Sequence, residues 1–293
     1  MWLFFHISRI HIAAIAAMGV FTFGWLFTGM YPWFLTIVCA LDWYLVNLIN
    51  KITDIREDRM NRVTGTDFII RNRRKLLHVT IFVFIVSIVI VHMLLPAITM
   101  LRILGHMLGV IYNWPLLPKK KRLKELYFWK NISSAFGFLI TLFGYPLAAV
   151  YSNNHSFEFP AGISWMTVFF SGVFFFFFEV SYEIIYDLRD ITGDAFAGLK
   201  TYPVVHGESV AVYIIDALLF FSFLTLLTGY LLHFVPWRIF IMSGAPILQF
   251  VVYKKALRRG IATGDCILIT WLGVTMLVIF HVWIIADLPG AGL

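Results

Sequence analysis

Cysteine and charge are scarce in this chain of 293 residues. It has two cysteines, and Asp, Glu, Lys and Arg together make up 13% of the residues, whereas 60% are hydrophobic. Such a low charge content excludes a water-soluble domain of this size, and we interpret residues 1–293 as a single membrane-embedded domain. Cys39 and Cys266 lie within apolar runs, which predicts packed thiols rather than a disulfide or a metal site.

Several motifs of other enzyme classes are also missing. The sequence contains no Gly-rich phosphate loop and no dinucleotide fingerprint. His78, His92 and His106 do not form the histidine boxes of a membrane di-iron site, so we expect them to be packing or interfacial residues. No small-residue cleavage site stands out after the first apolar run, which argues against a signal peptide.

Long apolar segments recur along the whole chain. Each approaches the roughly 20 residues that a helix needs to cross a hydrocarbon core of about 30 Å. The sequence therefore predicts an all-α, multi-pass membrane protein with about nine transmembrane helices. The predicted segments are 8–29, 32–54, 76–95, 97–114, 132–151, 161–186, 208–234, 237–254 and 264–287.

Basic residues are confined to alternate connections between these segments. Four stretches, 56–75, 119–130, 189–200 and 254–259, hold 19 of the 23 Lys and Arg residues. The positive-inside rule places these loops and the N-terminus in the cytoplasm and the C-terminus on the opposite side. Because topology accounts for the net charge of +7, we expect the lipid bilayer and not nucleic acid as a partner, and we infer no obligate protein partner.

A first polar cluster ends the second predicted helix. The stretch NLINKITDIREDRMN, residues 47–61, contains Asn50, Asp54 and Asp58 at intervals of four residues. Residues spaced in this way share one face of a helix. Taken alone, this cluster is typical of a solvated helix boundary.

A second polar cluster follows the sixth predicted helix and opens on the same side of the membrane. Its carboxylates also share a helix face by their spacing: Glu183, Asp187, Asp190 and Asp194. Glu179 and Glu183 lie deeper in this helix, where an unpaired carboxylate is costly, so we expect a functional or paired role for Glu183. Because two such clusters open on the same side of the membrane, we interpret them as parts of one functional site and not as two solvated helix ends.

The ligand types in these clusters indicate a metal and a substrate. Carboxylates with an Asn carbonyl form the all-oxygen set that suits Mg²⁺. Two such sites facing each other across an apolar cavity predict a substrate with a diphosphate at one end and a hydrocarbon at the other, that is, a prenyl diphosphate. The chain has 30 Phe, 12 Tyr and 10 Trp, some of which could shield an allylic cation.

At these residues the sequence resembles the UbiA superfamily of membrane prenyltransferases. The stretch NKITDIRED, residues 50–58, is similar to the first family motif NDxxDxxxD, with Lys51 in place of the usual Asp. DLRDITGDAFAGLKTYPVVHG, residues 187–207, is similar to the second motif, DxxDxxGD followed by a basic residue and TxP. Looser agreement extends to Arg9 near the first helix and to Tyr112 to Pro115, which precede basic residues.

The resemblance implies a helical barrel of nine spans around a central cavity. It also implies Mg²⁺-dependent cleavage of a prenyl diphosphate and transfer of the prenyl group to an unidentified acceptor, either aromatic or lipid-like. Position 51 lies off the face of the other ligands, so we expect Lys51 to be tolerated and to contact a carboxylate or the diphosphate. We expect Arg9, Lys120 and Lys200 to bind the diphosphate.

The roles expected for the acidic side chains follow from the same chemistry. Catalysis is assigned to Asp54, Asp58, Asp190 and Asp194. The metal ligands are Asn50, Asp54, Asp58, Asp187, Asp190 and Asp194.

Two alternative functions stay open at this stage. A terpene cyclase of the same fold would ionise a prenyl diphosphate without an acceptor. A transporter would need ionisable residues near the membrane midplane on several helices, whereas most acids here gather at one end.

Overall fold

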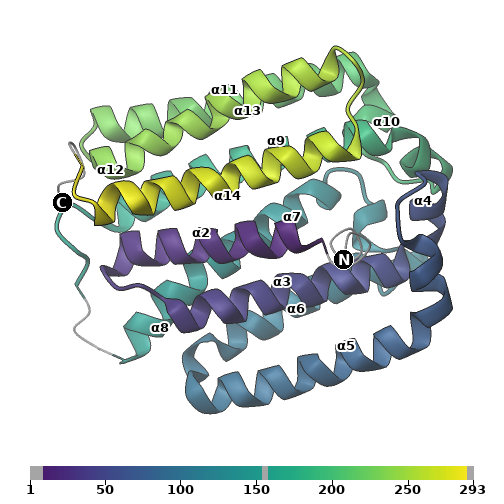
Figure 1. Cartoon of the computed structure of the whole chain (residues 1–293), viewed down its shortest axis with the longest axis horizontal. Helices are drawn as coiled ribbons and strands as arrows, with labels where there is room; N and C mark the ends of the chain where they lie inside the picture. Colours follow the sequence, from purple (N-terminus) through teal and green to yellow (C-terminus); the bar gives the residue numbers. More distant parts are fainter. Residues whose placement is uncertain (1–8, 154–157, 289–293) are drawn as a thin grey trace.

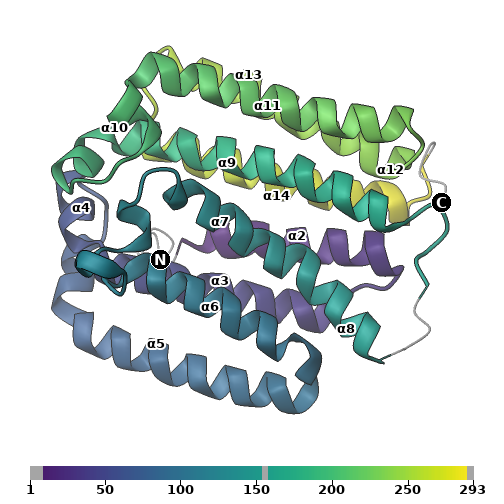
Figure 2. The ribbon, with the colours of Figure 1, turned by 180° about the vertical axis from the view of Figure 1, so that it is seen from behind.

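Helices form the regular structure throughout the part of the chain that the computed structural model describes, residues 9–153 and 158–288. They lie side by side in one elongated bundle (Figures 1 and 2). Ser8, with which the first predicted segment begins, lies outside the described residues. The helices are α2 (Ile10–Thr28), α3 (Trp33–Thr53), α4 (Ile55–Met60), α5 (Thr66–Leu94), α6 (Thr99–Asn113), α7 (Trp129–Leu139), α8 (Tyr145–Asn153), α9 (Trp165–Phe196), α10 (Tyr202–His206), α11 (Glu208–Leu231), α12 (Trp237–Phe240), α13 (Gly244–Leu257) and α14 (Thr263–Ile285).

Seven helical segments of the described chain are long and apolar enough to cross a membrane. They are α2, α3, α5, the run from α7 to Tyr151, α9, α11 and α14. Helices α6 and α13 lie beside them in the bundle, but they have 15 and 14 residues and are shorter than a full span. Each follows a 3₁₀ turn, Pro96–Ile98 or Ile241–Ser243, which takes up part of the predicted segment. The predicted count of nine spans is therefore not confirmed.

Two helices are longer than hydropathy predicts. Helix α5 begins at Thr66, ten residues before the predicted segment 76–95, and α9 continues to Phe196, ten residues beyond the predicted end at 186. Hydropathy marks only the apolar part of a helix, and polar residues continue both helices past it. At its other end, α9 begins with a capping box, in which the Ser164 hydroxyl accepts from the Thr167 N–H and the Thr167 hydroxyl accepts from the Ser164 N–H.

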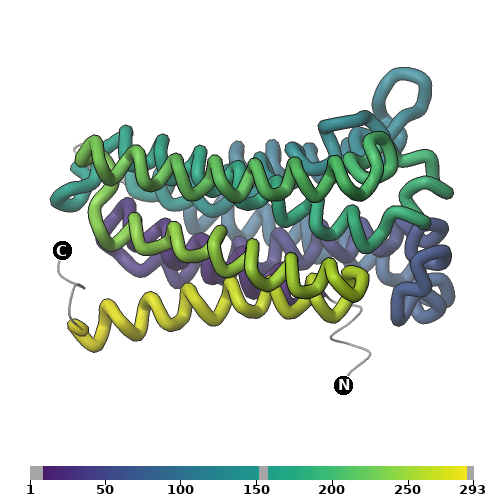
Figure 3. The backbone as a smooth tube through the Cα atoms, turned by 90° about the horizontal axis from the view of Figure 1, so that it is seen from above, coloured from purple at the N-terminus to yellow at the C-terminus, as the bar shows by residue number. Residues whose placement is uncertain are grey.

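Helices α2 and α9 both lie at the centre of the packing. Helix α2 contacts α3, α8 and α14, and α9 contacts α7 and α11. Helix α2 lies close to the segment Ile140–Gly144 at Gly19, where an added Cβ would lie 2.5 Å from Leu142 Cδ2. Cys39 and Cys266 are buried free thiols, as predicted. The tube in Figure 3 shows the bundle from above, with α14 along one edge.

The short helices α4 and α10 lie at the same end of the bundle (Figures 1 and 2). Helix α4 contains Asp58 of the first polar cluster and contacts α9, whose C-terminal part carries the second. The fold therefore brings both sequence motifs to one end, as their positions in the sequence predict.

Candidate active site

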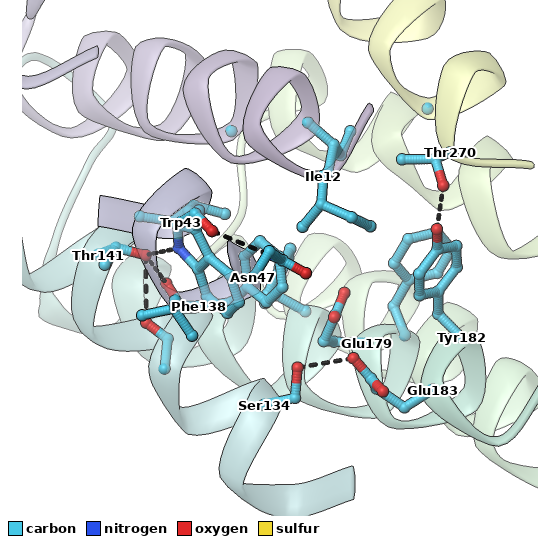
Figure 4. Close-up of a pocket in the computed structure, with 18 of the residues that line it drawn as sticks. Ile12, Trp43, Asn47, Ser134, Phe138, Thr141, Glu179, Tyr182, Glu183 and Thr270 are labelled. Carbon is cyan, nitrogen blue, oxygen red and sulfur yellow. Dashed lines mark hydrogen bonds between the residues drawn. The ribbon is translucent and has the colours of Figure 1, made fainter. Parts of the chain in front are cut away.

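A central cavity of about 240 Å³ lies inside the bundle. Its wall is built from α2, α3, α6, α7, α8, α9, α13 and α14, and aromatic side chains such as Trp43, Phe138 and Phe175 form much of it. Figure 4 shows polar side chains among them, with Glu179 and Glu183 projecting from α9 and Asn47 from α3. Asn50 and Arg9 also line the cavity, so it reaches the first sequence motif.

The first motif does not lie on one continuous helix, which corrects the sequence prediction. Helix α3 ends at Thr53, Asp54 has a ψ angle of 24°, and α4 begins at Ile55. The Thr53 hydroxyl donates to the backbone carbonyls of Ile49 and Asn50, at 3.1 and 2.9 Å. Such side-chain bonds to the backbone compete with helix continuation. The break turns Asp54 and Asp58 toward different partners.

Cationic side chains neutralise both carboxylates of the first motif. Lys51 is buried and its Nζ lies 2.8 Å from Asp58 Oδ2, so it contacts a carboxylate as expected. Lys124, which is 2% exposed, donates to Asp54. Burial lowers the pKa of Lys124, and the neighbouring Asp54 opposes that shift. Arg122 lies 2.8 Å from Glu57 Oε1 and 3.5 Å from Asp54 Oδ1.

Two carboxylates of the second motif, Asp187 and Asp194, share one cation. Asp187 Oδ1 and Asp194 Oδ2 lie 2.8 and 2.9 Å from Lys130 Nζ, and Asn131 donates to the other oxygen of Asp187 at 2.8 Å. Asp187 and Asp194 are seven residues apart on α9, which confirms that they share a face of one helix. Asp190 is less buried and accepts from Arg189 Nε at 2.8 Å.

A glycine in the second motif joins it to the first. The N–H of Gly193 donates to Asn61 Oδ1, at 3.0 Å, and a Cβ at position 193 would lie 2.3 Å from the Asn61 side chain. A side chain at this position would force the Asn61 amide to move out of this contact. The glycine of DITGD therefore lets the chain after α4 lie directly against α9.

The predicted diphosphate ligands differ in their surroundings. Arg9 precedes α2, lines the cavity and donates to Asn47 Oδ1 at 3.4 Å. Lys120 and Lys200 are both exposed. The basic side chains that contact the motif carboxylates from the 119–130 stretch are instead Arg122, Lys124 and Lys130. Sequence reasoning found this stretch but not these members of it. The assignment of Arg9, Lys120 and Lys200 to the diphosphate stays a prediction.

The sequence of residues 10–263 matches the family model of the UbiA prenyltransferase family. The chain belongs to this family. Membership of the family and the seven long apolar helices among its described residues together make the chain an integral membrane protein. No curated protein sequence matches the chain significantly.

Solved structures share the UbiA fold of this chain. A UbiA homologue from Archaeoglobus fulgidus bound to GPP and Mg²⁺ has a TM-score of 0.69 at 12% identity, covering 98% of this chain and 100% of the homologue. The same homologue bound to DMAPP and Mg²⁺ gives 0.68 at 13%, with the same coverage. A digeranylgeranylglyceryl phosphate synthase gives 0.56 at 15% identity, covering 95% of this chain and 94% of the synthase.

This UbiA family member also contains a buried polar network that the sequence did not reveal. Arg102 Nε donates to Asp42 Oδ2 at 3.0 Å, and its NH1 group donates to the Ser87 carbonyl at 3.0 Å. His106 Nε2 and the Tyr145 hydroxyl complete the shell of Asp42, at 3.0 and 2.9 Å. The network joins α3, α5, α6 and α8. His106 is thus a hydrogen-bonding partner inside the bundle, and not only a packing residue.

Proposed function

We propose that the chain is a Mg²⁺-dependent intramembrane prenyltransferase, which ionises a prenyl diphosphate and transfers the prenyl group to an acceptor. The observation that carries the proposal is the cavity itself. Its wall is largely apolar and aromatic, and two carboxylate clusters lie at one end of the bundle, joined by the contact of Asn61 with Gly193. A molecule with an anionic head and a hydrocarbon tail matches that arrangement.

The donor set of the second motif fits a divalent cation. Asp187 and Asp194 already converge on one positive centre, the Lys130 ammonium, as two carboxylate ligands of one ion do. Asn50, Asp54, Asp58 and Asp190 supply further oxygens of the kind that Mg²⁺ prefers. Mg²⁺ bound to these residues and to the diphosphate would stabilise the charge that develops on the leaving group.

The side chains of this protein then have distinct tasks. Lys124, Lys130 and Arg122 lie among the carboxylates, where they can pair with diphosphate oxygens once the acids bind the metal. Arg9, directly before α2, lines the cavity. The aromatic wall holds the tail away from water and presents π faces to an allylic cation.

Purified protein in detergent is expected to release pyrophosphate from at least one prenyl diphosphate when Mg²⁺ and an acceptor are present. A panel of geranyl, farnesyl and geranylgeranyl diphosphates covers the range of tail lengths, and excess EDTA should abolish the release because the carboxylates would have no metal. Product mass spectrometry identifies the prenylated acceptor. No release from a broad panel would contradict an enzymatic function, and a cyclised hydrocarbon formed without acceptor would instead identify a terpene cyclase.

Lys51→Asp is expected to make the stability of the protein depend more strongly on Mg²⁺. Lys51 is the cation that neutralises Asp58 inside the protein, at 2.8 Å. A carboxylate in its place leaves two like charges close together, which costs about 3 kcal/mol or more without a metal and adds a ligand when Mg²⁺ binds. We would measure thermal unfolding in detergent with Mg²⁺ and with EDTA.

Lys51→Met is the matched control, because it removes the ammonium without adding a ligand. It should lower the stability in both conditions by a similar amount. An equal difference between Mg²⁺ and EDTA in wild type and Lys51→Asp would show that Lys51 does not substitute for a metal charge.

A further inference from the structure

A second pocket lies outside the central cavity, where α4 is followed by α5. It has a volume of about 540 Å³, and none of its lining residues lines the central cavity. Its wall is formed by residues between Asp58 and Asn72, and it includes three arginines, Arg59, Arg62 and Arg71. The pocket is therefore separate from the space that would hold a prenyl chain.

The three arginines of the pocket have no acidic partner. All three are exposed, and none makes an ion pair or a side-chain hydrogen bond with another described residue. Two acids also lie in the wall, but Asp58 is neutralised by Lys51 at 2.8 Å. Asp67 lies one helical turn before Arg71, and no ion pair joins the two. The described wall is thus positively charged and favours an anionic ligand.

One of these arginines has a backbone conformation that favours glycine. Helix α4 ends at Met60, and Arg62 has a φ angle of 52°, in the left-handed region. The Val63 N–H donates to the Asp58 carbonyl at 2.8 Å and fixes this turn. The left-handed conformation is unfavourable for a residue with a Cβ, and helices commonly place glycine there. An arginine at this position indicates a role for its side chain.

A contact with α9 holds the turn in place. Asn61 lies between Arg59 and Arg62 in the sequence, and its Oδ1 accepts from the Gly193 N–H at 3.0 Å. The turn is thereby attached to the bundle. The position of the arginines is therefore set by α9 as well as by α4 and α5.

The pocket lies at the depth of lipid headgroups. The apolar run of α5 begins at Leu76, and Arg71 lies five residues earlier, which is about 7 Å along the helix axis. The headgroup layer on one side of a bilayer is about 5–7 Å thick. Figure 1 shows α5 at the outer edge of the bundle, where Phe82 and Ile85 are exposed to lipid. Phe68, which lines the pocket, is 43% exposed. A lipid beside α5 would therefore have its phosphate near Arg71.

We propose that the turn between α4 and α5 binds the phosphate headgroup of an anionic lipid, in the leaflet on the side of the two motifs. Arg59, Arg62 and Arg71 pair with the phosphate oxygens, and Phe68 contacts the glycerol backbone. The ligand is not a substrate of prenyl transfer, so this inference does not depend on the proposed function.

The test is native mass spectrometry of the full chain in a neutral detergent, with EDTA and about 150 mM salt, which limits electrostatic attraction to about 8 Å. EDTA prevents a metal ion at Asp58 from bridging to the lipid. We expect phosphatidylglycerol to bind about tenfold more tightly than phosphatidylcholine, whose choline cation the arginines repel. Arg71→Gln should raise the Kd of phosphatidylglycerol about tenfold, because it removes charge-assisted hydrogen bonds.

Arg73→Gln is the matched control for Arg71→Gln. Arg73 is also exposed, but it lies two residues further along α5, on the opposite side of the helix and outside the pocket. Its variant should bind phosphatidylglycerol as wild type does. Equal losses in the two variants would show that the whole basic surface attracts the lipid, and the pocket would be overturned.

Arg62→Gly separates lipid binding from folding. Glycine adopts the left-handed conformation without strain, so this variant should unfold at the same temperature as wild type or at a higher one when no lipid is present. Its Kd for phosphatidylglycerol should nevertheless rise about tenfold. Wild-type affinity in Arg62→Gly, or equal affinity of wild type for phosphatidylcholine, would contradict the proposal. Displacement of the lipid by an equal concentration of inorganic pyrophosphate would also overturn it, because the ligand would then be a soluble phosphate.

Discussion

Asp190→Ala and Asp54→Ala are each expected to reduce kcat by at least about 1,000-fold, with expression unchanged. These carboxylates lie at opposite halves of the site, on α9 and at the break between α3 and α4. With metal and diphosphate bound, each carboxylate would contribute to the charge that holds the metal, so its loss removes stabilisation of the leaving group. The measurement is pyrophosphate release at saturating substrate and Mg²⁺.

Two further variants make this result interpretable. Asp54→Ala leaves buried Lys124 without its partner, so Asp54→Asn, which keeps the shape and one oxygen, separates lost activity from lost folding. Asp216→Ala is the matched control, because Asp216 on α11 pairs with Lys254 on α13 and belongs to neither motif. Substantial activity in both Asp190→Ala and Asp54→Ala would contradict a site with two carboxylate halves.

Asp42→Leu is expected to destabilise the protein by about 3–5 kcal/mol. Asp42 is the common acceptor of Arg102, His106 and Tyr145, and Arg102 is 1% exposed. Removing one partner of a buried ion pair leaves the other charge uncompensated, which costs far more than the pair itself contributes. The measurement is the free energy of unfolding in detergent, or the Tm if unfolding is irreversible.

The double variant Asp42→Leu/Arg102→Leu tests this reason. It removes both charges and fills the space with apolar atoms, so we expect it to recover a large part of the lost stability. A double variant as unstable as the sum of the two single variants would show that the network stabilises through shape and not through charge compensation.

Much of the fold and the positions of the motifs could be predicted, because each helix that crosses a membrane needs an apolar segment of about the same length. Apolar length located most spans, and spacing placed Asp187 and Asp194 on one face. The helix break at Asp54 escaped prediction because it depends on a bond from Thr53 to the preceding turn. Loop conformation likewise decides that Lys124 is buried while Lys120 is exposed, although the two lie four residues apart.

The interior network was missed for a different reason. Asp42 and Arg102 are 60 residues apart, and nothing in the local pattern of either segment names its partner. The available signal was one acid and one base, each placed inside an apolar segment. Charged residues inside a membrane are usually paired with each other. An acid and a base that lie in two different apolar segments therefore predict a contact between those segments.

The length of α9 has a consequence for how the two products of the proposed reaction would leave. Its 32 residues extend about 48 Å, well beyond a hydrocarbon core of about 30 Å, and the carboxylates lie near its last turns. The diphosphate end would therefore open on water while Glu179, near the middle of the helix, faces the apolar interior. Pyrophosphate and prenylated acceptor would separate into different phases on release, one dissolving in water and the other remaining in the bilayer, and this partition would oppose the reverse reaction.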